Sequence, residues 1–198
     1  MCSSDLFRNE VETYNVSGKT LGLVGYGRIA KDVARIATKG LDMKVIVSRK
    51  SKRTDDIIEN VQIVDTIDEV FKKADFVSLH TPANPNTRGL VDINLMKKMK
   101  KPSYLINTSR GEVIVEKDLY QALKEGIITA AAVDVLEKEP PDNDNPLFEL
   151  DNIILTPHCA THTKETKDLM GLHAAMGLHS VISGGAPKWA VNKPENLK

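Results

Sequence analysis

The sequence predicts an α/β protein built on a doubly wound parallel sheet, and two regularities carry this prediction. Short, nearly all-apolar runs alternate with stretches of about ten residues whose apolar side chains recur at helical spacing. Strands that are apolar along their whole length are typical of parallel sheets covered by helices on both faces. The chain has 198 residues, which is enough for one domain with a substantial core.

The first half of the chain contains the clearest elements. The apolar run 20–24 ends in glycines, and a helical pattern over 27–39 begins directly after them and ends at Gly40. That pattern places four apolar residues on one face: Ile29, Val33, Ile36 and Ala37. Further strands are predicted at 43–47, 61–64 and 75–79, and further helices in a short amphipathic piece after Lys50 and at 67–73.

The second half continues the alternation. Asp92 is predicted to cap a helix, Gly126 to end another, and Pro140 with Pro141 to exclude regular structure from the stretch that follows them. The predicted strands are 104–107, 128–133 and 153–155, and the remaining predicted helices are 115–124 and 163–183.

Composition narrows the classes of partner. Acidic and basic residues are balanced at 27 each, so the net charge gives no reason to expect binding to nucleic acid or to an anionic membrane. No apolar run reaches the roughly 18 residues that a membrane span requires. Cys2 and Cys159 are the only cysteines, and they suggest neither a disulfide framework nor a zinc site. We therefore expect a cytoplasmic protein without a metal.

The turn between the first strand and the first helix has the features of a phosphate-binding loop. Gly25 permits a sharp turn, Gly27 lets a pyrophosphate approach the backbone, and Ala30 lets the helix pack closely on the strand. The helix N-terminus then offers N–H groups and a partial positive charge to phosphates. Glycine turns also arise for packing alone, and this is the alternative for the motif taken by itself.

Nearly all the polar residues of interest follow predicted strands. Because ligands of parallel sheets bind at the carboxyl ends of the strands, these residues are predicted to share one edge. They are Gly25 to Gly27, Ser48 to Lys50, His80 to Pro82, Thr108 to Arg110, Asp134 and His158. The expected organisation is a leader or arm at 1–17, a dinucleotide-binding domain at 18–162, a C-terminal helix at 163–185 and a tail at 186–198.

The residues after the second strand indicate which dinucleotide binds. An acidic residue there takes the ribose 2′-OH of NAD, whereas a basic residue accommodates the 2′-phosphate of NADP. This chain has Ser48, Arg49 and Lys50 at that place and no acid. We therefore favour NADP(H) over NAD(H). A solvated basic run is the alternative, but it does not explain the missing carboxylate.

Three further residues could act together in catalysis. Arg110 could bind a carboxylate through two parallel hydrogen bonds, although a surface ion pair is the ordinary role of such an arginine. Glu139 and His158, each unremarkable alone, could pair so that the carboxylate orients the imidazole and raises its pKa. The second ring nitrogen could then carry a proton to a substrate oxygen near neutral pH.

Five segments, in this order, resemble the cofactor-binding domain of the D-isomer-specific 2-hydroxyacid dehydrogenases, the family of D-3-phosphoglycerate dehydrogenase and glyoxylate/hydroxypyruvate reductase. The likeness covers Asn15 to Asn192, and the segments are SGKTLGLVGYGRIAKDVA, LHTPANPNTRGL, LINTSRGEVI, AAVDVLEKEPP and NIILTPHCATHT. The resemblance implies a Rossmann-like fold and a reversible hydride transfer between the nicotinamide and C2 of a small 2-oxo acid. Homodimers are common among such proteins.

The resemblance also implies roles for particular residues. Arg110 would bind the substrate carboxylate and carbonyl, and Glu139 would pair with His158, the acid/base. Arg28 and Ile29 would lie on the pyrophosphate, and Asp134 would face the nicotinamide. The other residues implied to line the cofactor are Thr81, Pro82, Thr87, Thr108, Ser109 and Ala160.

The chain departs from the family pattern at its start, because the family has a substrate domain before the cofactor domain and few residues precede the resemblance here. We expect either a fragment or a chain that works with another polypeptide, able to bind cofactor but turning over poorly alone. A nucleotide-sensing, corepressor-like protein that shares the fold is the alternative function. Formate dehydrogenase, a third, is disfavoured because it has glutamine at the place of Glu139.

Overall fold

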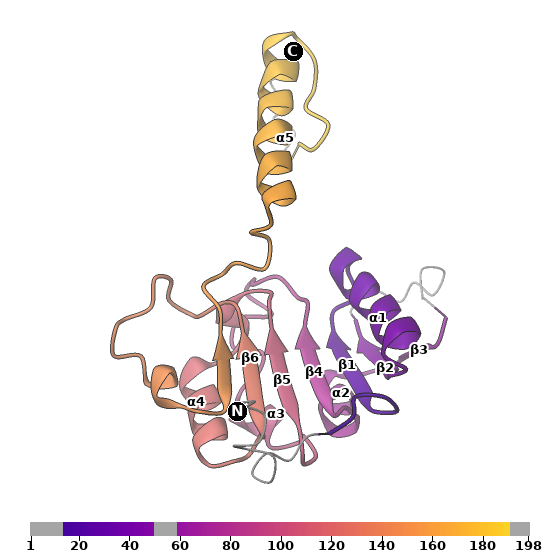
Figure 1. Cartoon of the computed structure of the whole chain (residues 1–198), viewed down its shortest axis with the longest axis vertical. Coiled ribbons are helices and arrows are strands. Elements are labelled where there is room, and N and C mark those ends of the chain that lie inside the picture. The colour runs from indigo at the N-terminus through magenta and orange to yellow at the C-terminus, as the bar shows by residue number, and fades with distance from the viewer. Residues whose placement is uncertain (1–13, 50–58, 191–198) are drawn as a thin grey trace, which may run out of the picture. The chain divides into compact units, whose positions relative to one another are not determined.

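The computed structural model describes residues 14–49 and 59–190, and its centre is a seven-stranded, wholly parallel sheet (Figure 1). The strand order is β3-β2-β1-β4-β5-β6-β7, so the chain builds outward from β1 in one direction and then returns to build outward in the other. The strands are β1 (Thr20–Val24), β2 (Lys44–Ser48), β3 (Val61–Ile63), β4 (Phe76–Leu79), β5 (Tyr104–Asn107), β6 (Ala130–Val133) and β7 (Ile153–Leu155).

Helices connect the strands. They are α1 (Arg28–Gly40), α2 (Ile67–Lys73), α3 (Ile93–Met96), α4 (Glu116–Lys124) and α5 (Lys164–Ile182), with short 3₁₀ turns η2 (Gly111–Val113) and η3 (Pro146–Glu149). The capping predicted for Asp92 is confirmed, because its carboxylate accepts a hydrogen bond from the Leu95 N–H at 2.8 Å. Gly126 follows α4 with φ of +63°, the left-handed conformation expected of a helix-ending glycine.

The chain divides into two units, Met1–Pro157 and His158–Lys198. The first contains the whole sheet and α1 to α4. The second contains α5, which buries none of its side chains. Thr163 caps the start of this helix, because its hydroxyl accepts a hydrogen bond from the Thr166 N–H at 3.1 Å. No helix among the described residues has the length and apolar character needed to cross a membrane.

Successive side chains along the central strands point to opposite faces of the sheet, and they contribute to two separate apolar clusters. Leu23 and Val45 pack with the alanines of α1, whereas Ile46 packs on the opposite side of the sheet with α2 residues such as Phe71. The larger cluster continues beneath α3 and α4 along β4, β5 and β6. β1 and β2 are thus buried on both faces, which accounts for their apolar runs in the sequence.

The second face of the sheet is less covered toward β7. Phe76 and Tyr104 stack there with ring centroids 4.7 Å apart, and both are partly buried. Further along, Ile106 is also partly buried, and Ile154 on β7 is 67% exposed. Within the described residues, the expectation that helices cover both faces therefore holds for β1 and β2, and it fails at β3, where Gln62 is exposed, and near β7.

The sequence-based elements agree closely with the structure, with three corrections. The strand predicted at 128–133 begins at Ala130, and η3 forms in the stretch after the two prolines that was predicted to lack regular structure. The predicted apolar face of α1 is confirmed for Val33 and Ala37 and is wrong for Ile29 and Ile36, which are 70% and 52% exposed. The buried face carries small residues that let the helix approach the sheet: Ala30, Ala34 and Ala37. The amphipathic piece predicted after Lys50 lies outside the described residues.

Candidate dinucleotide site

The candidate site lies at the point where the strand order reverses. β1 has β2 on one side and β4 on the other, and the connections leaving β1 and β4 depart on opposite sides of this point. Loops that diverge in this way leave a crevice outside the carboxyl ends of the strands, where parallel α/β proteins bind their ligands. The predicted glycine turn follows β1, and the loop that begins with His80 follows β4.

The first glycine of the turn is required by geometry. Gly25 has φ of +95°, and a Cβ added to it would lie 2.5 Å from the carbonyl oxygen of His80. Its N–H donates to the carbonyl of Ser48 at 2.9 Å, so the turn is fixed against the ends of both neighbouring strands. Any larger residue at this position would push the turn out of register with β2 and β4.

The second glycine faces open space. No atom lies within 4 Å of a Cβ added to Gly27, which is the N-cap of α1 and provides no side-chain cap. Arg28 and Ile29 follow as exposed residues, and the first turn of α1 carries no acid. Backbone N–H groups at this helix end are therefore available to an anion, and the pyrophosphate of a dinucleotide fits the space that the missing side chain leaves.

Basic residues gather beside this turn. Ser48 ends β2, and the Arg49 guanidinium carbon that follows lies 5.7 Å from the ring centroid of Tyr26. The Lys31 ammonium lies 5.8 Å from the same centroid. NAD-binding proteins carry an acidic residue here that accepts hydrogen bonds from the ribose hydroxyls, but this chain has Ser48 and Arg49 instead. Lys50 lies outside the described residues.

The loop after β4 is held by its own side chains. The Ser78 hydroxyl and the Nε2 atom of His80 lie 3.0 Å apart, and burial lowers the pKa of His80 below its ordinary value of 6.5. Further along, the Thr87 hydroxyl donates to the Pro82 carbonyl at 2.5 Å, which closes the loop on itself. Thr87 is buried, so its hydroxyl shapes the loop, while Thr81, whose backbone lies next to Gly25, is partly buried and Pro82 is exposed.

A buried asparagine organises the turn after β5. Asn107 has no exposed surface, and its carboxamide oxygen accepts hydrogen bonds from the Ser109 N–H at 3.0 Å and the Ser109 hydroxyl at 2.8 Å. Its amide nitrogen donates to the Arg110 carbonyl at 2.9 Å. The guanidinium of Arg110 donates to the Ser109 carbonyl at 2.7 Å and is exposed, as is Thr108. Arg110 is thus presented to solvent from a fixed backbone.

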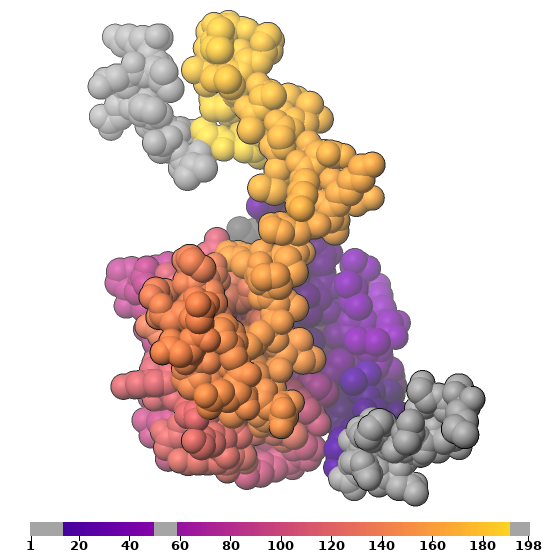
Figure 2. All heavy atoms as spheres, turned by 60° about the vertical axis from the view of Figure 1, so that its left-hand side comes forward, coloured from indigo at the N-terminus to yellow at the C-terminus, as the bar shows by residue number. Residues whose placement is uncertain are grey.

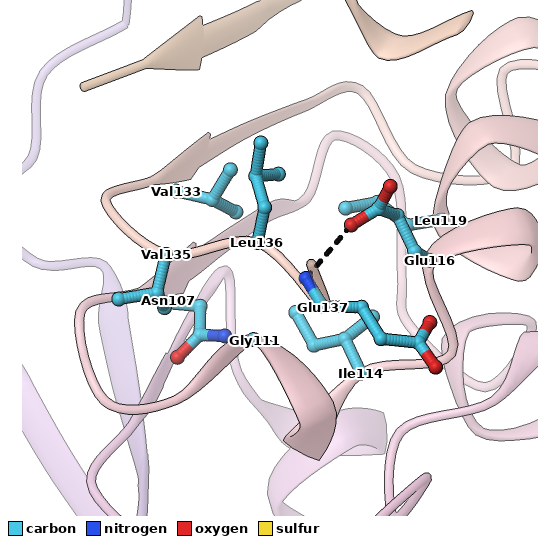
Figure 3. A pocket seen from close by; sticks show the side chains of 9 residues that line it. All are labelled: Asn107, Gly111, Ile114, Glu116, Leu119, Val133, Val135, Leu136 and Glu137. Atoms are coloured by element: carbon cyan, nitrogen blue, oxygen red, sulfur yellow. Dashed lines mark hydrogen bonds between the residues drawn. The ribbon is translucent and has the colours of Figure 1, made fainter. Parts of the chain in front are cut away.

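The turn after β5 rests on the segment after β6. A Cβ added to Gly111 would lie 1.9 Å from the Leu136 carbonyl oxygen, so the two backbones are in direct contact. A small pocket beside this contact has Glu116 at its wall, and the Glu116 carboxylate accepts a hydrogen bond from the Glu137 N–H at 2.9 Å (Figure 3). The same carboxylate accepts a second hydrogen bond from the Asn145 side-chain amide at 2.7 Å. The segments that carry the predicted catalytic arginine and glutamate are therefore held against each other.

The segment between β6 and β7 supplies two predicted site residues. Asp134 is 4% exposed and accepts a hydrogen bond from the Thr156 hydroxyl at 2.5 Å, which joins the ends of β6 and β7. Glu139 is exposed, and one of its carboxylate oxygens accepts from the Leu136 N–H at 3.0 Å. The segment itself makes up much of the surface at the β7 edge of the sheet (orange in Figure 2).

His158 and Ala160 belong to the second unit, so their part in the site stays a prediction. His158 itself has φ of +49°, a left-handed conformation that is uncommon for a residue with a side chain. Such backbone outliers concentrate at functional sites. No group of three or more potential metal ligands occurs within residues 14–49 and 59–190.

Sequence reasoning missed three residues that shape the site. Asn107 was treated as the end of a strand, although a polar residue closing an apolar run and followed by Thr-Ser-Arg-Gly is a signal for a side chain that caps a turn. Ser78 interrupts an apolar strand in the same way. Tyr26 lies between two glycines, and nothing in the sequence alone indicates that its ring meets Arg49.

A parallel sheet with an open glycine turn at its switch point defines a dinucleotide-binding domain of the Rossmann type. The family model for the NAD-binding domain of D-isomer specific 2-hydroxyacid dehydrogenases matches residues 3–160. The chain therefore belongs to that family, as the five segments indicated.

Relatives with assigned names agree with the family. The chain is 41% identical over 189 residues to D-3-phosphoglycerate dehydrogenase of Methanocaldococcus jannaschii, covering 94% of this chain and 36% of that protein. It is 40% identical over 181 residues to glyoxylate reductase of Korarchaeum cryptofilum, covering 91% and 54% respectively. The chain thus spans between about a third and about half of the length of these relatives.

Solved structures show the same architecture with both cofactors. A glyoxylate reductase from Paecilomyes thermophila superposes with a TM-score of 0.85 at 31% identity, over 95% of this chain and 56% of that one. An acyclic imino acid reductase in complex with NADPH and D-Arg gives 0.77 at 36% identity, over 87% and 54%. A D-lactate dehydrogenase with NAD⁺ from Lactobacillus jensenii gives 0.84 at 27% identity, over 93% and 59%.

Proposed function

We propose that this chain is the cofactor-binding part of an NADP-preferring enzyme that moves a hydride between the nicotinamide and C2 of a small 2-oxo or 2-hydroxy acid. One observation carries the proposal: an open glycine turn at the switch point lies beside Arg49, at the place where NAD-specific proteins carry an acid. The relatives named above, which are reductases and dehydrogenases, support the reaction class, and they give a corepressor-like function no support.

The cofactor, when bound, supplies the hydride, and the chain supplies binding and orientation. In this proposal the backbone N–H groups after Gly27 bind the pyrophosphate, and Arg49 with Lys50 binds the 2′-phosphate. Arg110 binds the substrate carboxylate, because an exposed guanidinium on a fixed turn suits a planar anion. Thr81, Pro82, Thr108, Ser109, Asp134 and Ala160 are proposed to line the remaining cofactor surface.

The proton would move through His158. In this proposal Glu139 accepts a hydrogen bond from one imidazole nitrogen and so holds the ring, while the other nitrogen gives a proton to the carbonyl oxygen during reduction and removes it during oxidation. The exposed carboxylate of Glu139 and the left-handed backbone of His158 are compatible with these roles.

Cofactor titrations test the preference directly. NADPH and NADH affinities are to be measured by fluorescence for the wild-type chain and for Arg49→Asp. We expect the wild type to prefer NADPH, and the substitution to weaken NADPH binding about tenfold or more while NADH binding changes little. Arg35→Asp is the matched control, because Arg35 lies on the exposed side of α1 and pairs with Asp32 at 3.4 Å. An unchanged NADPH preference in Arg49→Asp would contradict the assignment.

Turnover tests the reaction. The chain spans only part of its named relatives, so we expect weak reduction of glyoxylate or hydroxypyruvate by the chain alone and a marked gain when the remaining half of a relative is supplied. Arg110→Gln should abolish that gain. Cofactor binding without turnover, even with the second half present, would favour the sensing function instead.

A further inference from the structure

Tyr26 occupies an unusual position in the glycine turn. It stands between Gly25 and Gly27, yet its side chain is 8% exposed and packs in the apolar cluster beneath α1 with Leu23 and Ala30. The residue at this place therefore does more than connect two glycines, because its ring belongs to the apolar core and also lies near two basic side chains.

Two cations lie close to this one ring. The Arg49 guanidinium follows the end of β2 and lies 5.7 Å from the centroid of the Tyr26 ring, and the Lys31 ammonium comes from the first turn of α1 and lies 5.8 Å from it. Both distances are within the range in which the negative face of an aromatic ring attracts a cation. Both cationic side chains are partly buried, which strengthens the attraction relative to an exposed pair.

The helix end beside this cluster also favours anions. The N-terminal end of α1 carries a partial positive charge, and acids are the residues that ordinarily stabilise such an end. Here the first turn contains Arg28 and Lys31 and no acid, and Asp32 pairs with Arg35 farther along the helix. The glycine turn thus lies beside the N-terminal end of α1 and beside the side chains of Arg28, Lys31 and Arg49, and a helix end of this kind favours the binding of a phosphate.

We propose that Tyr26 is a positioning residue for cofactor choice, and that its ring holds Arg49 and Lys31 as a pair that binds the phosphate on the 2′ position of the adenosine ribose. This inference rests on the proposed NADP preference and adds two residues to it. An aliphatic side chain of similar size would fill the same space but would leave both cations without the ring that attracts them. The phenol hydroxyl has no part in the proposal, so phenylalanine should serve as well as tyrosine.

Adenosine 2′,5′-bisphosphate and adenosine 5′-monophosphate differ only in the 2′-phosphate, so the ratio of their affinities isolates this interaction. We would measure both by calorimetry for the wild-type chain, Tyr26→Phe, Tyr26→Leu and Lys31→Met. The wild type and Tyr26→Phe should prefer the bisphosphate equally. Tyr26→Leu and Lys31→Met should each lose about fivefold of that preference or more, while monophosphate affinity stays near that of the wild type.

Tyr120→Leu is the matched control. Lys124 lies 5.1 Å from the Tyr120 ring centroid on α4, so the substitution removes the same kind of contact away from the glycine turn and should leave the affinity ratio unchanged. If Tyr26→Leu does not fold, as judged by its thermal melt, Lys31→Met carries the test, because Lys31 lies outside the apolar cluster.

The outcomes separate the two hypotheses. A wild-type chain that binds both nucleotides equally would refute the NADP preference itself. A wild-type preference that survives in Tyr26→Leu or Lys31→Met, or an equal loss for both nucleotides, would overturn the role of Tyr26 and leave the preference standing.

Discussion

The buried carboxamide of Asn107 donates a hydrogen bond of 2.9 Å to the backbone carbonyl of Arg110, three residues further along the chain. The same side chain accepts two hydrogen bonds from Ser109, so the turn that presents the proposed substrate-binding arginine is built on one residue. Asn107 therefore fixes the backbone of Arg110 while the guanidinium of Arg110 stays exposed and can reach a substrate.

Asn107→Ala should lower the free energy of unfolding by about 1–3 kcal/mol, because it leaves partners of three hydrogen bonds unsatisfied at a buried site. Urea denaturation measures this change. Asn94→Ala is the control: Asn94 is exposed on α3, and its replacement should change stability by less than about 0.5 kcal/mol. Equal stabilities for the two variants would show that the Asn107 network contributes nothing.

The two glycines of the turn should respond differently to alanine. Gly25→Ala forces a Cβ to within 2.5 Å of the His80 carbonyl at a positive φ, so both stability and cofactor binding should be lost. Gly27→Ala meets no atom within 4 Å and should fold normally, yet weaken NADPH binding about tenfold or more because the methyl group occupies the phosphate space. Thermal melts with NADPH titrations distinguish these outcomes. Wild-type NADPH affinity in Gly27→Ala would place the pyrophosphate elsewhere.

His80 should make stability depend on pH. Burial lowers its folded-state pKa below 6.5, so above that pH the ring is neutral in both states, and as the pH falls from 6.5 the unfolded chain takes up a proton first. The wild type should therefore lose stability from 6.5 down to the folded-state pKa, and His80→Asn should lose less over that window. Urea unfolding across the window tests this. Ser78→Ala keeps the imidazole and should keep most of the pH dependence; the same pH dependence in His80→Asn as in wild type would refute the assignment.

The Thr156 hydroxyl should stabilise the ends of β6 and β7 through Asp134. Thr156→Val removes the donor to a carboxylate that is 4% exposed, so the free energy of unfolding should fall by about 1–3 kcal/mol. Thr156→Ser retains the hydroxyl and should recover most of that loss in the same denaturation experiment. Equal losses in both variants would indicate that the methyl group, rather than the hydrogen bond, matters.

The sequence predicted the sheet well because each parallel strand is short, apolar and followed by a polar turn. The sequence predicted the buried face of α1 only in part, because the large apolar residues and the alanines of this helix both recur at helical spacing. Ile29 and Ile36 suggested the core by their size, but the helix approaches the sheet through small residues such as Ala30 and Ala34. The apolar character of a residue does not reveal how closely two elements approach.

The sequence predicted those features of the candidate site that follow from the order and direction of the strands. Parallel strands bring their carboxyl ends to one edge, so Gly25, Arg49 and Arg110 could be assigned to that edge from their order along the chain. The contacts that fix them, such as the ring of Tyr26 near Arg49, depend on side-chain packing between residues distant in sequence. The role of His158 depends on the second unit and stays a prediction.

The shortest strands, β3 and β7, are the two at the borders of the sheet, with three residues each. An unpaired border strand can act as a template on which another polypeptide aggregates, and natural proteins limit this risk by keeping such strands short. The sheet therefore offers an incoming strand only a short row of unpaired backbone groups at β3 and at β7. In a chain with so many apolar β-segments, short border strands are one means of limiting amyloid-like growth.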